Sequence, residues 1–260
     1  MRDYLNARAD MKIVFHEFFY PVYTSDPASA PGRMEAIINS LPSHAEIIEP
    51  VPATLEQIGL AHSEGHINDV RNYGLLDIAS LAAGAAIETA RIGLVEPAFG
   101  VIRPPGHHAS SDSAWGFCFF NNMAIGLLTL KSEGAIDSAF VLDFDLHYGD
   151  GTANILEGAE WVQIHNPAKN SREAYLSETE QLLEAAKVDI IGISAGFDNH
   201  MLDWGGLLST KDYYLMGRMV KNAAAVNGGG CFGILEGGYN HSVLGQNVAA
   251  LINGLAEPAE

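Results

Sequence analysis

Short runs of consecutive apolar residues alternate along the chain with longer stretches in which apolar residues recur every three or four positions. The short runs end at turn residues, which is typical of buried β-strands. They cover residues 11–15, 98–103, 139–143, 188–194 and 230–235. The longer stretches have the helical period and cover residues 33–41, 75–94, 121–133, 172–186, 210–225 and 240–254.

This alternation predicts the fold class. Strands that alternate with helices form a parallel sheet whose two faces are covered by helices. The chain has 260 residues, of which 48% are hydrophobic, enough for one large core. We therefore expect an α/β protein in which residues 1–260 form a single domain.

Acidic residues outnumber basic ones by 32 to 14, which gives a formal net charge of −18. Because no stretch is densely basic, we expect no direct contact with nucleic acid. A negative surface favours cationic molecules such as polyamines or lysine-like amines, although it also serves solubility. The sequence lacks a bilayer-spanning apolar run and a signal-peptide pattern at its start. The sequence therefore predicts a cytoplasmic protein that does not contact a membrane.

Only two cysteines occur, Cys118 and Cys231, and both have apolar neighbours. Such surroundings suit small buried side chains and indicate a reducing compartment. Two cysteines are too few for a metal site made of cysteine alone, so a transition metal would need histidine and carboxylate ligands.

Polar motifs follow four of the five predicted strands. They are PPGHH at 104–108, DFDLHYGD at 143–150, AGFDNH at 195–200 and EGGYN at 236–240. Because open parallel sheets bind ligands beyond the carboxyl ends of their strands, we expect these motifs to meet at one edge of the sheet.

Asp145 and His147 are candidate metal ligands together with Asp198. Being two positions apart at the end of a strand, the first two should share a face of the sheet. Asp-x-His alone would equally fit a helix cap or a hydrogen-bonded histidine. However, Asp143 and Asp150 flank the pair, and carboxylates this close repel one another unless cations neutralise them. Two carboxylates and an imidazole can hold zinc and leave one position open.

His107 and His108 follow the rigid turn Pro104-Pro105-Gly106. Two histidines beside several carboxylates can have different pKa values and so supply a general base and a general acid. A surface dipeptide without a role is the alternative. The turn at this strand's end favours the catalytic interpretation.

Two further segments combine glycine with an aromatic residue. Tyr239 follows Gly237 and Gly238, which permit close approach to a ligand, and its hydroxyl could donate to an oxyanion. A tyrosine at such a turn is also common as a packing residue. Gly116 and Phe117 lie in an apolar segment. We interpret it first as part of the core and secondly as the wall of a substrate channel.

The segments RPPGHHA, GFCFFNNMAIG, DFDLHYGDGT, SAGFDNH and LEGGYN, in this order, resemble the histone deacetylase superfamily, which includes bacterial deacetylases and acetylpolyamine amidohydrolases. The resemblance covers nearly the whole chain. It implies the arginase-deacetylase fold, a three-layer α/β/α sandwich with a central parallel sheet. It also implies hydrolysis of an N-acetylated amine, such as acetyl-lysine or an acetylpolyamine.

By motif position, the resemblance implies one zinc ion per chain on Asp145, His147 and Asp198. It makes His107 the base, oriented by Asp143, and pairs His108 with Asp150 as the acid or an electrostatic partner. Tyr239 would hydrogen-bond the substrate carbonyl. The residues implied to contact substrate are Gly116, Phe117, Gly237 and Gly238.

The chain departs from the family pattern in three places. A potassium ion is implied near Asp143, on the carbonyls of Asp145 and His147, but Gln163 stands where the family has a serine, which argues against it. The segments after His165 and between residues 66 and 79 are short. We therefore expect an open mouth with Phe117 as the one recognisable wall, and a neighbouring subunit of a homo-oligomer could replace the missing loops.

Two other functions remain open at this point. Shortened loops would also fit a binding or scaffold protein that keeps the motifs without activity. A ureohydrolase with two manganese ions, like arginase, would share the fold. The tandem histidines and Tyr239 favour a deacetylase with one metal ion.

Overall fold

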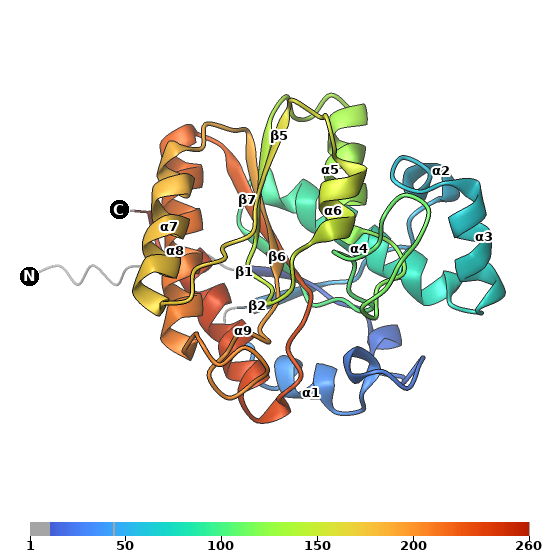
Figure 1. Ribbon diagram of the computed structural model, residues 1–260, viewed down its shortest axis with the longest axis horizontal. Coiled ribbons are helices and arrows are strands. Elements are labelled where there is room, and N and C mark those ends of the chain that lie inside the picture. Colours follow the sequence, from blue (N-terminus) through green and yellow to red (C-terminus); the bar gives the residue numbers. More distant parts are fainter. Residues whose placement is uncertain (1–10, 44, 260) are drawn as a thin grey trace, which may run out of the picture.

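The computed structural model describes residues 11–43 and 45–259. Its centre is a seven-stranded sheet with the strand order β2-β1-β3-β7-β6-β4-β5 (Figure 1). Every neighbouring pair of strands runs parallel. The strands are β1 (Met11–Val14), β2 (Ala45–Ile48), β3 (Ala98–Gly100), β4 (Ala139–Asp143), β5 (Val162–His165), β6 (Ile190–Ala195) and β7 (Gly230–Leu235).

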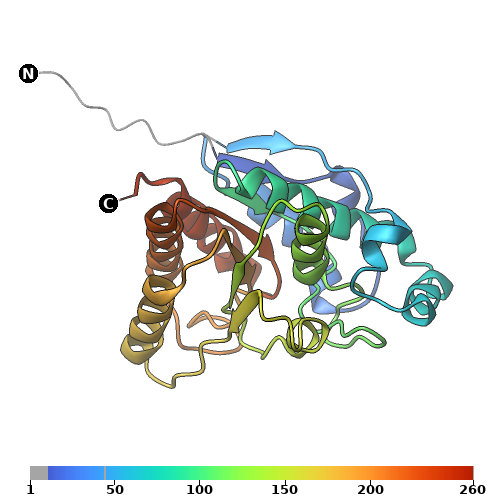
Figure 2. The same cartoon turned by 90° about the horizontal axis from the view of Figure 1, so that it is seen from above.

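Helices cover both faces of the sheet, which gives the expected three-layer α/β/α sandwich (Figures 1 and 2). One layer contains α1 (Arg33–Ile38), α7 (Arg172–Ala185), α8 (Thr210–Asn227) and α9 (His241–Ala256). The other contains α2 (Leu55–Ile58), α3 (Glu64–Asn72), α4 (Leu76–Gly93), α5 (Asn122–Ser132) and α6 (Asp150–Ile155). Of these described helices, none has the length and apolar character needed to cross a membrane.

The central strands are the ones that the apolar runs predicted. Every residue of β4, β6 and β7 is buried, because helices lie on both sides of them. The edge strands β2 and β5 are partly exposed and carry Glu46 and Gln163, which interrupt the apolar pattern. β2 was therefore missed, and β5 was expected only from the family resemblance. The short helices α2, α3 and α6 were also missed.

β3 ends at Gly100, three residues before the predicted end of this strand. The reason lies at Arg103, which is fully buried. Its guanidinium group donates to the carbonyl oxygens of residues in the loop between β1 and α1, which are Phe19, Tyr20, Pro21, Ala28 and Ala30. Val101 N still donates to Val14 O of β1 at 2.9 Å, and the chain then turns so that Arg103 binds this loop. The PPGHH segment begins from there.

Candidate metal centre and catalytic cavity

Asp145, His147 and Asp198 converge at the carboxyl edge of the sheet. Each offers a ligand atom, and these atoms lie within 4.8 Å of one another. Asp145 and Asp198 are buried, whereas His147 is about 39% exposed. The residues come from the loops that follow β4 and β6, as the strand-end motifs predicted.

The argument that placed Asp145 and His147 on one face of a strand is wrong, because β4 ends at Asp143. Hydrogen bonds in the loop orient these residues instead. Asp145 N donates to Asp143 Oδ1 at 3.2 Å, and His147 N donates to Asp145 Oδ1 at 3.0 Å. Leu146 N donates to Asp198 Oδ1 at 3.1 Å, which joins the two loops.

The side chains of Asp145, His147 and Asp198 are arranged to bind a cation. His147 Nδ1 lies 3.2 Å from both Asp145 Oδ1 and Asp198 Oδ2, and a single N–H cannot serve both oxygens well. Asp198 Oδ2 is buried and makes no hydrogen bond. A buried carboxylate oxygen without a donor is costly. Because a metal ion at this point would satisfy it, Asp145, His147 and Asp198 fit a three-ligand metal site with an open position.

The side chains of Asp145, His147 and Asp198 shift one another's pKa values. The neighbouring carboxylates of Asp145 and Asp198 raise the pKa of His147 to about 10. Burial and the Asp145 charge raise the pKa of Asp198 to about 6. Burial opposes ionisation of Asp145, but His107 and His147 outweigh it and lower its pKa.

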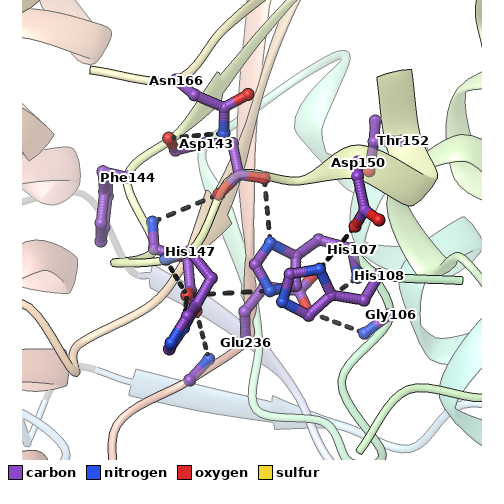
Figure 3. Close-up of polar contacts among 12 residues, drawn as sticks. Gly106, His107, His108, Asp143, Phe144, His147, Asp150, Thr152, Asn166 and Glu236 are labelled. Atoms are coloured by element: carbon purple, nitrogen blue, oxygen red, sulfur yellow. Dashed lines mark hydrogen bonds and ion pairs between the residues drawn. The ribbon is translucent and has the colours of Figure 1, made fainter. Parts of the chain in front are cut away.

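His107 and His108 emerge from the PPGHH turn beside the metal ligands (Figure 3). His107 Nδ1 lies 3.1 Å from Asp143 Oδ2, and His107 Nε2 lies 3.7 Å from Asp145 Oδ1. Burial alone would lower the pKa of His107, but the Asp145 and Asp143 carboxylates raise it well above its usual range.

His108 has the opposite shift. Its Nδ1 lies 2.7 Å from Asp150 Oδ1, yet burial and the neighbouring His107 lower its pKa to about 4. The two adjacent imidazoles thus have different pKa values, and the shifts favour a proton on His107 and a neutral His108, the reverse of the base and acid roles that the family resemblance implies. Asp150 Oδ2 also accepts a hydrogen bond from Trp115 Nε1 at 2.8 Å.

Glu236 joins the histidine turn to the end of β7. Its side chain is fully buried, and its Oε2 accepts hydrogen bonds from Gly106 N at 2.7 Å and His107 N at 3.2 Å (Figure 3). Burial raises the pKa of Glu236 to about 7. The next residue, Gly237, donates its N–H to Asp145 Oδ2 at 2.9 Å. A Cβ on Gly237 would lie 2.6 Å from this oxygen, so only glycine fits here.

The turn that carries Tyr239 is held from two sides. Arg33 is fully buried, and its Nε and Nη2 donate to Gly238 O and Glu236 O at 2.9 and 2.6 Å. On the other side, Asp203 Oδ2 accepts hydrogen bonds from Tyr239 N and Asn240 N, each at 2.8 Å. These contacts fix the position of the tyrosine ring next to the metal ligands.

The sequence profile of the histone deacetylase domain matches residues 71–175 and 162–255, more than half of the chain. The chain belongs to the histone deacetylase family. It is 27% identical to a probable deacetylase of Methanothermobacter thermautotrophicus, over 86% of this chain and 84% of the relative. It is 30% identical to a probable deacetylase of Archaeoglobus fulgidus, over 88% and 81%.

The chain is also 29% identical to the histone deacetylase-like amidohydrolase of Pseudomonas aeruginosa, over 65% of this chain and 55% of the relative. The crystal structure of the HDA15 HD domain has the same fold, with a TM-score of 0.83 and 24% identity over 96% of this chain and 91% of that one. Since the sequence relatives are named deacetylases and amidohydrolases, this chain is a hydrolase that acts on amides.

The cavity of this deacetylase family member is small. Its volume is about 110 Å³, and it is lined by Pro105, His107, His108, Trp115, Gly116, Phe117, His147, Trp204, Gly237 and Tyr239. Phe117 has a positive φ of 71° and packs edge-on to Tyr239 at 5.9 Å. Gly238 lies outside this lining, in the turn behind Tyr239. We expected Phe117 to be the one recognisable wall of the mouth. Trp115 and Trp204 line it as well.

The residue beside Asp143 on β5 differs from the sequence-based assignment. Gln163 pairs with Phe140 and is exposed, so it lies away from the metal loop. Asn166, one position beyond the last pair of the two strands, donates its Nδ2 to Asp143 O at 3.2 Å (Figure 3). Asn166, and not Gln163, is therefore the residue that contacts Asp143 from this side. The Oδ1 of Asn166 is buried and unpaired.

Several residues that shape this site were not singled out as functional from the sequence: Arg33, Asp203, Glu236, Trp115 and Trp204. Arg33, Asp203 and Glu236 act through contacts between distant parts of the chain, and Arg33 and Gly238 are 205 positions apart. The two tryptophans lie in irregular loops, where no periodic pattern predicts which way a side chain faces.

Proposed function

We propose that this chain is a zinc-dependent deacetylase that hydrolyses the amide of a small N-acetylated amine. The observation that carries the proposal is the convergence of three metal-donor groups within 4.8 Å at a cavity that His107, His108 and Tyr239 also line. Zinc is the metal that suits two carboxylates and one imidazole with an open position. Location in the cytoplasm remains a prediction, as does assembly into a homo-oligomer.

Asp145, His147 and Asp198 would hold the zinc ion. When bound, zinc would polarise a carbonyl oxygen, lower the pKa of water and offset the carboxylate charge that now raises the pKa of His107. His107 Nε2 faces the cavity, because its Nδ1 is engaged by Asp143. It is therefore placed to take a proton from the attacking water.

The remaining side chains serve the amide itself. Burial and the Asp145 charge raise the pKa of Tyr239, so its hydroxyl stays protonated and can donate to the substrate carbonyl oxygen. The proton that His107 takes from water can pass to the departing amine nitrogen, and His108, oriented by Asp150, lies beside His107. The products are acetate and the free amine.

A substrate panel tests the proposal. The purified protein, loaded with zinc or cobalt, is assayed for acetate release from acetylputrescine, acetylspermidine and acetyl-lysine peptides. We expect metal-dependent release from at least one of them, abolished by a chelator and restored by zinc. Release from none, with the metal bound, would overturn the proposal. Elemental analysis should find about one zinc ion per chain, whereas two manganese ions would indicate a ureohydrolase.

Asp203 offers a test of how the Tyr239 turn is positioned. In Asp203→Ala, the N–H groups of Tyr239 and Asn240 lose their acceptor, so the tyrosine should no longer be held at the cavity. We expect a fall in kcat of about 10- to 100-fold, the range seen when supporting residues of a metal site are removed. Zinc content should not change. Asp137→Ala, at a fully exposed aspartate, is the control. Unaltered kcat in Asp203→Ala would contradict this role.

A further inference from the structure

Two tryptophans stand at the mouth of the cavity. Trp115 and Trp204 both line it and are 54% and 53% exposed. The third tryptophan of the chain, Trp161, lies elsewhere, with Lys131 Nζ at 5.7 Å from its ring. Single exposed aromatic residues are ordinary, but two large ones at the entrance of a small cavity form an apolar surface that suits ligand contact.

One face of each indole is covered by a ring of the site. Trp115 stacks on His108, with 3.8 Å between centroids and 29° between planes. Trp204 stacks on Tyr239 at 4.1 Å and 27°. Because each tryptophan is nevertheless about half exposed, its opposite face is open to solvent. The site therefore presents two open indole faces.

A hydrogen bond holds the indole of Trp115, whereas Trp204 is held by a hydrogen bond of its backbone and by its stacking on Tyr239. Trp115 Nε1 donates to Asp150 Oδ2 at 2.8 Å, and Trp204 N donates to Asp203 Oδ1 at 2.9 Å. Surfaces that are fixed before binding lose little conformational entropy when a ligand arrives. The open faces are thus pre-formed contact surfaces.

The size of the cavity decides which part of a substrate reaches these faces. A volume of about 110 Å³ is small beside the roughly 300–1,000 Å³ of ordinary ligand pockets. That space holds an acetyl group and its amide, but not a long amine chain. The rest of the amine must therefore leave the cavity past Trp115 and Trp204.

Charge indicates what that outer part of the substrate carries. The face of an indole attracts cations through its quadrupole, and tryptophan is the strongest side chain in this respect. Asp150, about 44% exposed, and Asp203 lie next to the two tryptophans. Among the described residues that line the cavity, none is a lysine or an arginine. The whole chain carries a net charge of −18.

We propose that Trp115 and Trp204 determine specificity by holding, on their open indole faces, a positively charged amine group carried by the part of the substrate outside the cavity. This inference rests on the proposed deacetylase function for its substrate. The binding surface itself can be tested without turnover.

Tryptophan fluorescence provides that test. In Trp161→Phe, the described residues contain no tryptophan except the two at the mouth, and Trp161 is far enough from the cavity that activity should be unchanged. The zinc-loaded variant is titrated with acetylputrescine, which is cationic, and with N-butylacetamide, a neutral amide of similar length. We expect acetylputrescine to change the emission and to bind roughly 10-fold more tightly, with an affinity that falls as salt is added.

Substitution of each tryptophan distinguishes a role in substrate specificity from a role limited to packing on neighbouring rings. In Trp115→Leu and Trp204→Leu, we expect KM for acetylputrescine to rise about 3- to 10-fold, but KM for N-butylacetamide by less than about 2-fold. Phenylalanine at either position keeps an aromatic face and should restore part of the preference. A role limited to packing on His108 or Tyr239 would instead lower kcat equally for both substrates.

The outcomes are distinguishable from those of the proposed function. Equal binding of the two ligands, or emission that neither ligand changes, overturns the inference even if hydrolysis proceeds. Preferential binding of acetylputrescine without hydrolysis of any amide supports the cation surface and overturns the deacetylase proposal.

Discussion

Asp198→Ala is expected to abolish deacetylation and zinc binding together. Asp198 is fully buried, its Oδ2 makes no hydrogen bond, and this oxygen lies 3.2 Å from His147 Nδ1. Alanine leaves two ligands, of which only Asp145 is a carboxylate. Removal of a residue that supports a metal ligand typically lowers metal affinity or activity 10- to 100-fold. Loss of a direct ligand should therefore lower activity on the order of 10³-fold or more.

Three measurements on the same preparations check this expectation: acetate release, zinc per chain and thermal unfolding with and without zinc. At zinc concentrations about 100-fold above the dissociation constant, binding should stabilise the wild-type protein by roughly 2.7 kcal/mol, and much less in the variant. For a chain of this size the corresponding rise in Tm is about 5–10 °C. If Asp198→Ala keeps a full complement of zinc, the assignment of this ligand is wrong.

Tyr239→Phe should lower kcat by about 10²- to 10³-fold, the loss seen when a single donor to a developing oxyanion is removed. Phenylalanine keeps the ring, so the stacking on Trp204 and the edge-on contact with Phe117 remain. The variant differs from the wild-type protein only in the hydroxyl group. Because the hydroxyl acts chiefly in the transition state, KM should change little.

Tyr148→Phe is the matched control for Tyr239→Phe. Tyr148 directly follows the metal ligand His147, but its side chain is 62% exposed and does not line the cavity. The same loss of a hydroxyl should therefore leave kcat within about 2-fold. Zinc content should be normal in both variants. Similar activity of Tyr239→Phe and the wild-type protein would exclude the proposed donor.

The parts of the fold that could be predicted are those that a single local pattern specifies. β4, β6 and β7 are buried on both faces and read as continuous apolar runs, and the motifs after them mark the edge at which the site forms. β2 could not be recognised, because an edge strand with partial exposure has no such run. The end of β3 was misjudged, since Arg103 binds a loop that no local pattern connects with it.

In the site, too, the residues that lie in local motifs could be predicted, but the contacts between distant parts of the chain could not. Asp145, His147 and Asp198 could be named because each lies in a recognisable motif, and the structure brings them together. Their orientation could not be derived from strand alternation, since it depends on hydrogen bonds between two loops. The neighbour of Asp143 could be identified only from strand register, which places Asn166 there instead of Gln163.

The position of β7 has a consequence for how the protein is made. β7 lies in the middle of the sheet, between β3 and β6, yet it is the last strand in the chain. Glu236 at its end holds the N–H groups of Gly106 and His107, 130 and 129 positions earlier. During synthesis, the histidine turn therefore lacks its acceptor until the chain has been made as far as Glu236. A ribosome-bound chain that stops before residue 230 should lack a working catalytic centre, so hydrolysis begins only after β7 and the Tyr239 turn have been made.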